Sequence, residues 1–64
     1  MDASAIGAAV RARRRSLDLT QEELADLAGV SPRFLGALER GRPGARLDHV
    51  VAVLHALGLE LEVR

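Results

Sequence analysis

The sequence of 64 residues contains no cysteine, no lysine, no tryptophan and no tyrosine, and Phe34 is its single aromatic residue. Without cysteine, neither disulfides nor zinc-thiolate sites can stabilise a core this small, so association of copies is the remaining common device. No stretch approaches 18 consecutive apolar residues, which argues against a membrane span. The N-terminal charges follow the apolar part, the reverse of a secretory signal, so we expect a cytoplasmic protein.

The residue combinations that support catalysis are also missing. There is no cysteine or lysine to act as a nucleophile, and no glycine-rich loop with the spacing that holds phosphates. His49 and His55 would lie about 240° apart around a helix, so they do not form a metal-binding pair. We therefore predict no enzymatic activity, no cofactor and no metal site.

Charge is balanced overall but segregated along the chain. The formal net charge is zero, from nine arginines and nine acids. Residues 1–16 carry four arginines against one acid, residues 17–32 carry four acids and no base, and residues 33–48 carry four arginines against two acids. Folding can bring the two basic segments onto one surface, and the local potential of that surface matters more than the sum.

A complete set of start and stop signals predicts a helix over 21–28. Thr20 and Glu23 have the spacing of a capping box, in which each side chain bonds the other residue's amide. Gly29 can adopt the left-handed conformation that ends a helix.

A second set of signals follows directly and predicts a helix over 32–40. Ser31 is a favourable N-cap, Pro32 fits the first helical position, and Gly41 ends the helix. The pattern therefore indicates two short helices joined by a tight turn.

Each of these helices has a predicted buried side and an exposed side. The expected buried residues are Leu24, Ala25, Leu27 and Ala28 in the first helix, and Leu35 and Leu38 in the second, with Phe34 at the edge. The opposite stripe of the second helix is Arg33, Gly36, Ala37 and Arg40, at i, i+3, i+4 and i+7. Two arginines around two very small residues would let this helix approach another surface closely.

Two further helices are predicted outside this pair. Helical spacing of Ile6, Val10, Arg14 and Leu17 indicates a first helix over about 4–17, capped by either Asp2 or Ser4. The residues Leu47, Val50, Val51, Leu54 and Leu57 indicate a fourth helix over about 47–57, which Gly58 ends.

The C-terminal tail changes period. Leu59, Leu61 and Val63 alternate with charged residues, which predicts a half-buried strand over about 59–63. A lone strand is unstable, so the economical solution is a two-stranded antiparallel sheet between two copies. The alternative is a tail that packs its leucines on the fourth helix.

Residues 21–40 resemble the 20-residue helix-turn-helix of the lambda repressor and Cro-like (XRE-type) DNA-binding domains. The signature positions are occupied by Gln21, Ala25, Gly29, Val30, Leu35 and Leu38. The segments RRRSLDLTQEELA and ARLDHVVAVLHALGLELEV are similar to the HipB-like subgroup. The resemblance implies an all-α, four-helix DNA-binding domain over residues 1–64, with the C-terminal strand pairing across a homodimer.

The resemblance also implies roles for individual residues. Base reading is expected from Ser31, Pro32, Arg33, Gly36 and Ala37, although Pro32 replaces a residue that often reads bases. Phosphate contacts are expected from Gln21, Arg40, Arg42, Arg46, Arg11 and Arg15. The resemblance further implies a structural ion pair, Arg14–Glu39, and a dimer interface of Leu59, Leu61 and Val63.

These expectations define two functional hypotheses and two alternatives. The first is a homodimeric, nucleoid-associated repressor that binds a pseudo-palindromic operator on double-stranded DNA. The second adds a HipA-like kinase toxin as partner, the chain being the antitoxin and autorepressor of a HipBA-like operon. The alternatives are a stand-alone regulator without a toxin, and a helix-turn-helix module that contacts only proteins.

Overall fold

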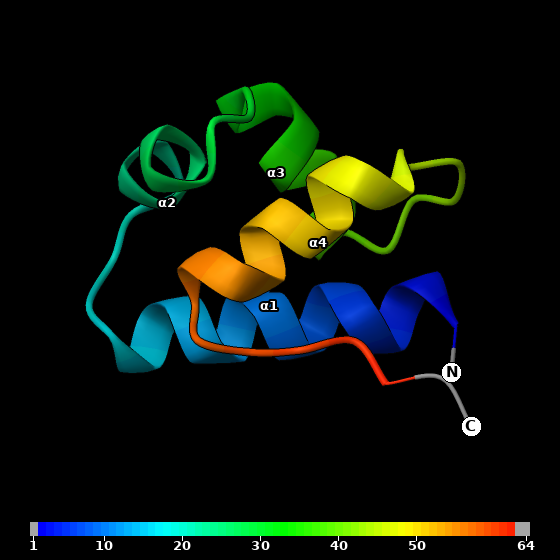
Figure 1. The fold of residues 1–64 in the computed structure, drawn as a ribbon, viewed down its shortest axis with the longest axis horizontal. Helices are drawn as coiled ribbons and strands as arrows, with labels where there is room; N and C mark the ends of the chain where they lie inside the picture. Colours follow the sequence, from blue (N-terminus) through cyan, green and yellow to red (C-terminus); the bar gives the residue numbers. More distant parts are fainter. Residues whose placement is uncertain (1, 63–64) are drawn as a thin grey trace.

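The computed structural model describes residues 2–62, and this part of the chain folds into four helices. They are α1 (Ala3–Ser16), α2 (Gln21–Ala28), α3 (Pro32–Glu39) and α4 (Leu47–Ala56) (Figure 1). Every predicted helix boundary lies within one residue of the observed one. The predicted all-α, four-helix architecture is confirmed.

The helix ends are formed by the expected local hydrogen bonds. The Thr20 side chain accepts from the Glu23 amide at 3.0 Å, and Glu23 accepts from the Thr20 amide at 2.9 Å. Gly29 ends α2 with a φ of 72°, and the Ser31 side chain accepts from the Phe34 amide at 3.0 Å. At α1, where the sequence left two candidates, the cap is Asp2, which accepts from the Ala5 amide at 2.8 Å.

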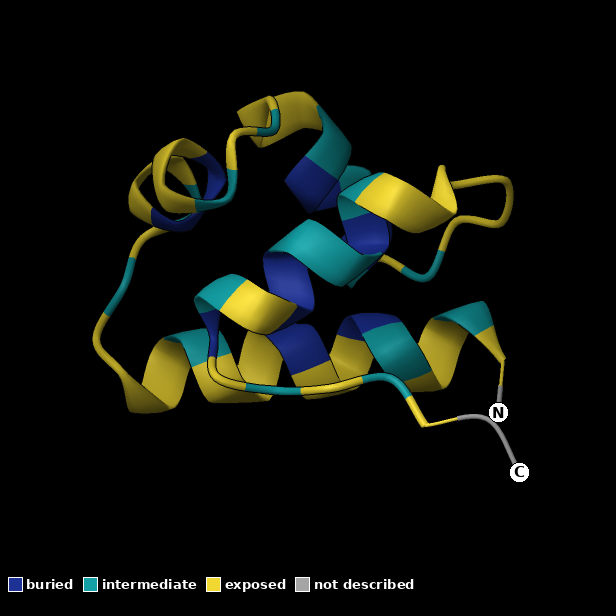
Figure 2. Ribbon diagram, in the orientation of Figure 1, coloured by how far each residue is buried: buried dark blue, intermediate teal, exposed yellow. Residues whose placement is uncertain are grey.

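One aliphatic core holds the helices together (Figure 2). α1 packs against α3, and α2 packs against both α3 and α4. The buried hydrophobic residues are Val10, Leu24, Ala25, Leu35, Leu38, Val50, Val53, Leu54 and Leu57. Because the core contains no aromatic ring, its cohesion depends on close contact between branched aliphatic side chains.

Three leucines of the helical patterns are exposed. Leu27, which we expected to be buried, is 66% exposed, so that prediction is wrong; Leu47 is 64% exposed and Leu17 is 44% exposed. α2 contacts its neighbours through Leu24 and Ala25, and within residues 2–62 no element covers the side that bears Leu27. Leu47 and Leu17 lie at the start of α4 and just beyond α1, where the helices extend past the core.

The predicted strand is not present in residues 59–62, where the structure shows no regular secondary structure. The tail instead runs along α1 (Figure 1), with Leu59 and Leu61 half-buried against the core. The Leu59 amide donates to the Leu54 carbonyl at 2.8 Å. A single chain offers no partner strand, so the leucines pack on their own protomer. Val63, the third predicted interface residue, lies outside the described residues.

None of the helices in residues 2–62 is both long enough and apolar enough to span a membrane.

Candidate nucleic-acid interface

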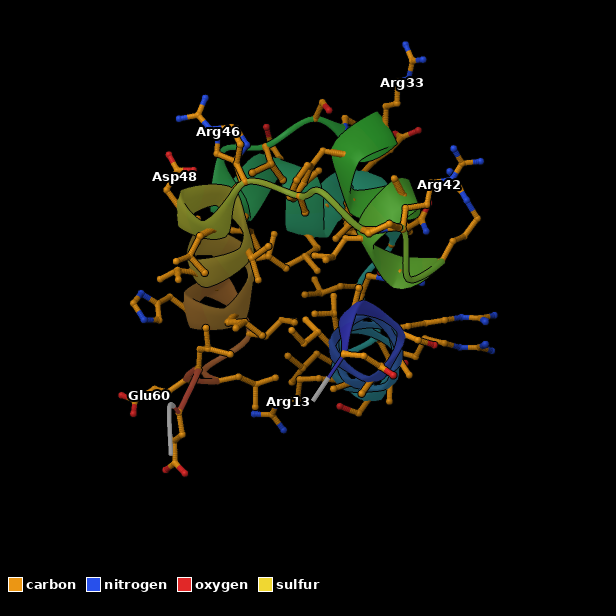
Figure 3. All side chains as sticks on the ribbon, turned by 90° about the vertical axis from the view of Figure 1, so that its right-hand side faces the viewer. Arg13, Arg33, Arg42, Arg46, Asp48 and Glu60 are labelled. Carbon is orange, nitrogen blue, oxygen red and sulfur yellow. The ribbon has the colours of Figure 1, made fainter. Side chains whose placement is uncertain are left out.

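The outer face of α3 presents arginine side chains to solvent. Ser31, Pro32, Arg33 and Arg40 are exposed and Ala37 is half-buried. Arg33 projects away from the ribbon (Figure 3), and neither Arg33 nor Arg40 has an ion-pair partner within residues 2–62. Their guanidinium groups are therefore free to donate to external acceptors.

Gly36 was predicted to be exposed, because it belongs to the outer stripe of α3, but the structure buries it. It is buried, because the side chains of Arg40 and Gln21 lie over it. A Cβ at this glycine would lie 3.2 Å from Arg40 Nη1 and 3.8 Å from Gln21 Oε1. The exposed stripe of α3 is thus interrupted in its middle by two polar side chains, one of them from α2.

The predicted Arg14–Glu39 ion pair is present and connects α1 to the end of α3. Arg14 Nε lies 2.7 Å from Glu39 Oε2, and Arg14 Nη2 donates to Glu39 Oε1 at 3.0 Å. Arg14 Nη1 also donates to the Leu19 carbonyl at 2.8 Å. The Arg14 and Glu39 side chains are only 12% and 3% exposed. This fork-to-carboxylate geometry fixes orientation as well as distance.

Gln21 joins this ion pair, which the sequence did not predict. Its Nε2 donates to Glu39 Oε1 at 3.1 Å across 18 residues of sequence. The start of α2 is thereby tied to the end of α3, so the angle between the two helices is held by a polar network. No local pattern relates positions 21 and 39, and only the tertiary structure brings them together.

The environment of Glu39 keeps it ionised. Burial raises the pKa of this carboxyl, but hydrogen bonds from Arg14 and Gln21, together with the positive charges of Arg14 and Arg11, outweigh burial. The net effect holds the pKa of Glu39 below its ordinary value. Conversely, the hydrogen bond to Glu39 raises the pKa of Arg14 despite partial burial.

The predicted phosphate-contacting arginines do not all share one environment. Arg11 and Arg15 are exposed on α1, and Arg42 is exposed just after α3, on the side to which Arg33 projects (Figure 3). Arg46 lies apart from them, beside Asp48, and the two form an exposed ion pair of 2.9 Å. The carboxylate of Asp48 therefore offsets the charge that Arg46 would offer to a phosphate.

Arg13 is a structural residue that the sequence did not identify. Its Nε donates to the Leu57 carbonyl at 3.1 Å, linking α1 to the end of α4. Figure 3 places it between α1 and the tail, away from Arg33 and Arg42. The contact spans 44 residues, so no helical periodicity could reveal it.

The two histidines lie in different surroundings. His49 packs edge-on against Phe34, with ring centroids 5.3 Å apart, and His55 is exposed. Within residues 2–62 no three histidine, cysteine or acidic side chains are grouped to hold a metal ion.

Comparison with known proteins gives the family. The sequence model of the helix-turn-helix family (HTH_3) matches residues 10–63. An uncharacterised HTH-type transcriptional regulator, y4mF of Sinorhizobium fredii, is 45% identical over 58 residues, covering 91% of this chain and 76% of that protein. Another HTH-type transcriptional regulator, from Methanothermobacter thermautotrophicus, is 47% identical over 53 residues, covering 80% of this chain and 74% of its own length.

Solved structures agree with this assignment. Two crystal structures of the clp gene regulator ClgR from Corynebacterium glutamicum are similar to this fold, with TM-scores of 0.80 and 0.82 and 41% sequence identity. They match 91% and 92% of this chain, which spans 62% and 76% of the two ClgR chains. With the family model covering most of its length, the chain belongs to the helix-turn-helix (HTH_3) family.

Proposed function

We propose that the chain is a sequence-specific, double-stranded DNA-binding transcriptional regulator that acts as a homodimeric repressor. The observation that carries this proposal is the outer face of α3, where Arg33 and Arg40 lack ion-pair partners within the described residues. α3 is also held rigidly to α1 and α2 by the Arg14–Glu39–Gln21 network. A rigid helix with free guanidinium groups suits insertion into a major groove. The proposed site of action is the nucleoid, in the cytoplasm.

The proposal is tested by fluorescence anisotropy with the DNA upstream of the protein's own gene and with scrambled DNA of equal length. We expect tighter binding to the upstream DNA and a steep loss of affinity between about 50 and 200 mM salt, because phosphate contacts release counterions. Equal, weak binding to both would place the operator elsewhere or require a co-repressor. No binding at low salt would contradict DNA binding and favour the module that contacts only proteins.

Arg33 is the proposed principal base reader. Its guanidinium can bond guanine O6 and N7 together, so Arg33→Ala should lower specific affinity by about 1–3 kcal/mol per half-site and relax the preference at one base pair. The matched control is Arg46→Ala, which removes an arginine already paired with Asp48. If Arg33→Ala leaves every base preference intact, Arg33 does not read bases.

Dimerisation would place two α3 helices about 34 Å apart on a pseudo-palindrome. We propose the interface at the tail, where Leu59 and Leu61 are only half-buried against their own core and keep apolar surface for contact with a second copy. Sedimentation equilibrium should give twice the monomer mass at the concentrations that saturate the operator. A monomer under those conditions would contradict this interface.

The finer role of antitoxin depends on the resemblance to HipB-like proteins alone. In that role the dimer would also bind a HipA-like kinase toxin and repress its own operon. A kinase reading frame next to the gene, and co-purification of its product with this chain, would support the role. Without such a neighbour, the stand-alone regulator is the better description.

A further inference from the structure

At the centre of the outer face of α3, two polar side chains lie over Gly36, where the sequence predicted an exposed glycine. Arg40 Nη1 and Gln21 Oε1 both lie within 4 Å of the point where a Cβ of Gly36 would stand. The two groups come from different helices, and Gly36 leaves the space between them open.

The orientation of the Gln21 amide follows from its partner. An ionised carboxylate only accepts hydrogen bonds, so the oxygen of Glu39 must face the NH₂ group of Gln21. Arg14 in turn holds Glu39 in place with two hydrogen bonds. The amide oxygen of Gln21 is therefore the atom left on the side of Gly36. An oxygen there attracts donors such as a guanidinium.

Gly36 provides the space that Arg40 occupies. Positions 36 and 40 are one helical turn apart on the same face, so the Arg40 side chain can fold back across the glycine. Its guanidinium is thus brought from the end of α3 towards the middle, about 4.5 Å along the helix axis from position 33. Arg33 and Arg40 then address base pairs close to one another.

We propose that Arg40 is a base-reading, specificity-determining residue, placed over Gly36 and beside the amide oxygen of Gln21, rather than a phosphate contact. This inference rests on the proposed function. The guanidinium has the paired donors that match guanine O6 and N7 in the major groove. In this proposal Gln21 contacts no base itself, and its amide oxygen borders the space in which the Arg40 guanidinium lies.

The test measures the affinity of the full chain for a set of duplexes in which each operator base pair is substituted in turn. We expect Arg40→Ala to reduce discrimination at one or two base pairs of each half-site by about 5- to 150-fold. The salt dependence of binding should stay near that of the wild type. A uniform loss on all sequences, with the salt slope reduced by about one, would identify a phosphate contact and overturn the proposal.

A second variant tests the placement without removing the arginine. Gly36→Ala puts a methyl group 3.2 Å from Arg40 Nη1, so the flexible end of Arg40 must shift by a few tenths of an ångström. We expect the preference to change at the same base pairs as in Arg40→Ala, while the circular dichroism melting curve shows an intact fold. Arg42→Ala is the matched control and should weaken binding to all duplexes alike. Unchanged preference in Gly36→Ala would overturn the role of the glycine.

The wild-type and Arg40→Ala measurements distinguish failure of the proposed function from failure of the role of Arg40. If the wild-type chain binds no duplex with preference, the proposed function fails and the inference fails with it. If the wild type discriminates and Arg40→Ala discriminates equally well, only the inference is overturned.

Discussion

Replacing Gly7 with alanine should destabilise this fold severely. Gly7 lies in α1 at its crossing with α3, and a Cβ there would overlap the backbone carbonyl oxygen of Leu38 and lie 3.1 Å from that of Glu39. Backbone atoms cannot rotate away as a side chain can, so the helices must separate and loosen the core. Overpacking of this kind costs about 1–3 kcal/mol and occasionally more, against a gain of about 0.5–1 kcal/mol in helix propensity.

A net loss of about 1–2 kcal/mol would be a large part of the stability of so small a domain, which is about 3–10 kcal/mol. Thermal unfolding followed by circular dichroism should show a melting temperature lower by roughly 10 °C. The matched control is Gly36→Ala, the same substitution in another helix, where only side-chain ends lie nearby. We expect that control to be as stable as the wild type or slightly more so. Equal stability of the two variants would show that the α1–α3 crossing tolerates a methyl group.

Removing Arg14 should have a comparable effect, because it leaves the partly buried Glu39 with a neutral partner. In Arg14→Met the carboxylate of Glu39, whose side chain is 3% exposed, would keep only its hydrogen bond from Gln21. Breaking a fully buried pair from one side costs about 3–5 kcal/mol, and the cost is smaller here because both residues are only partly buried; replacing both partners with apolar residues is often neutral or stabilising. Urea denaturation should therefore show a large loss for Arg14→Met and a substantial recovery for Arg14→Met/Glu39→Leu.

The pH dependence distinguishes an electrostatic cause from lost packing. In the wild type the pKa of Glu39 lies below its ordinary value of 4.5, so ionisation of this group stabilises the fold above that pH. This contribution is lost as the pH falls through the folded pKa. In Arg14→Met only the Gln21 hydrogen bond and the charge of Arg11 still oppose burial, which should raise the pKa of Glu39, so protonation relieves the penalty as the pH falls. The stability gap between the two proteins should narrow from pH 7 to about pH 4. A constant gap would indicate lost packing alone.

The difference between the predicted and observed tail has a clear physical origin. Alternation of Leu59 and Leu61 with glutamates indicates that one side of the tail is buried, and both leucines are indeed half-buried. Alternation does not say what covers that side. In one chain the covering surface includes Ile6 and Ala9 of α1, which border the same depression as the tail.

The sequence by itself determined the helices of this protein and the sites where they begin and end. Caps and helix stops act over three or four residues, as the hydrogen bonds of Thr20 with Glu23 and of Ser31 with Phe34 show. A short stretch of sequence is therefore enough to predict where a helix begins and ends. The family resemblance added the Arg14–Glu39 pair, which no local rule contains.

Only the tertiary structure decided which parts of each helix face become buried and which polar groups meet. Leu27 is an apolar residue at a predicted core position and is exposed, because within residues 2–62 no helix packs on that side of α2. Gly36 has the spacing of an exposed position and is covered, because Gln21 and Arg40 lie over it. Burial and hydrogen bonding between elements depend on the angles at which helices cross. Those angles arise from contacts such as Gly7 against Leu38, between residues far apart in the chain.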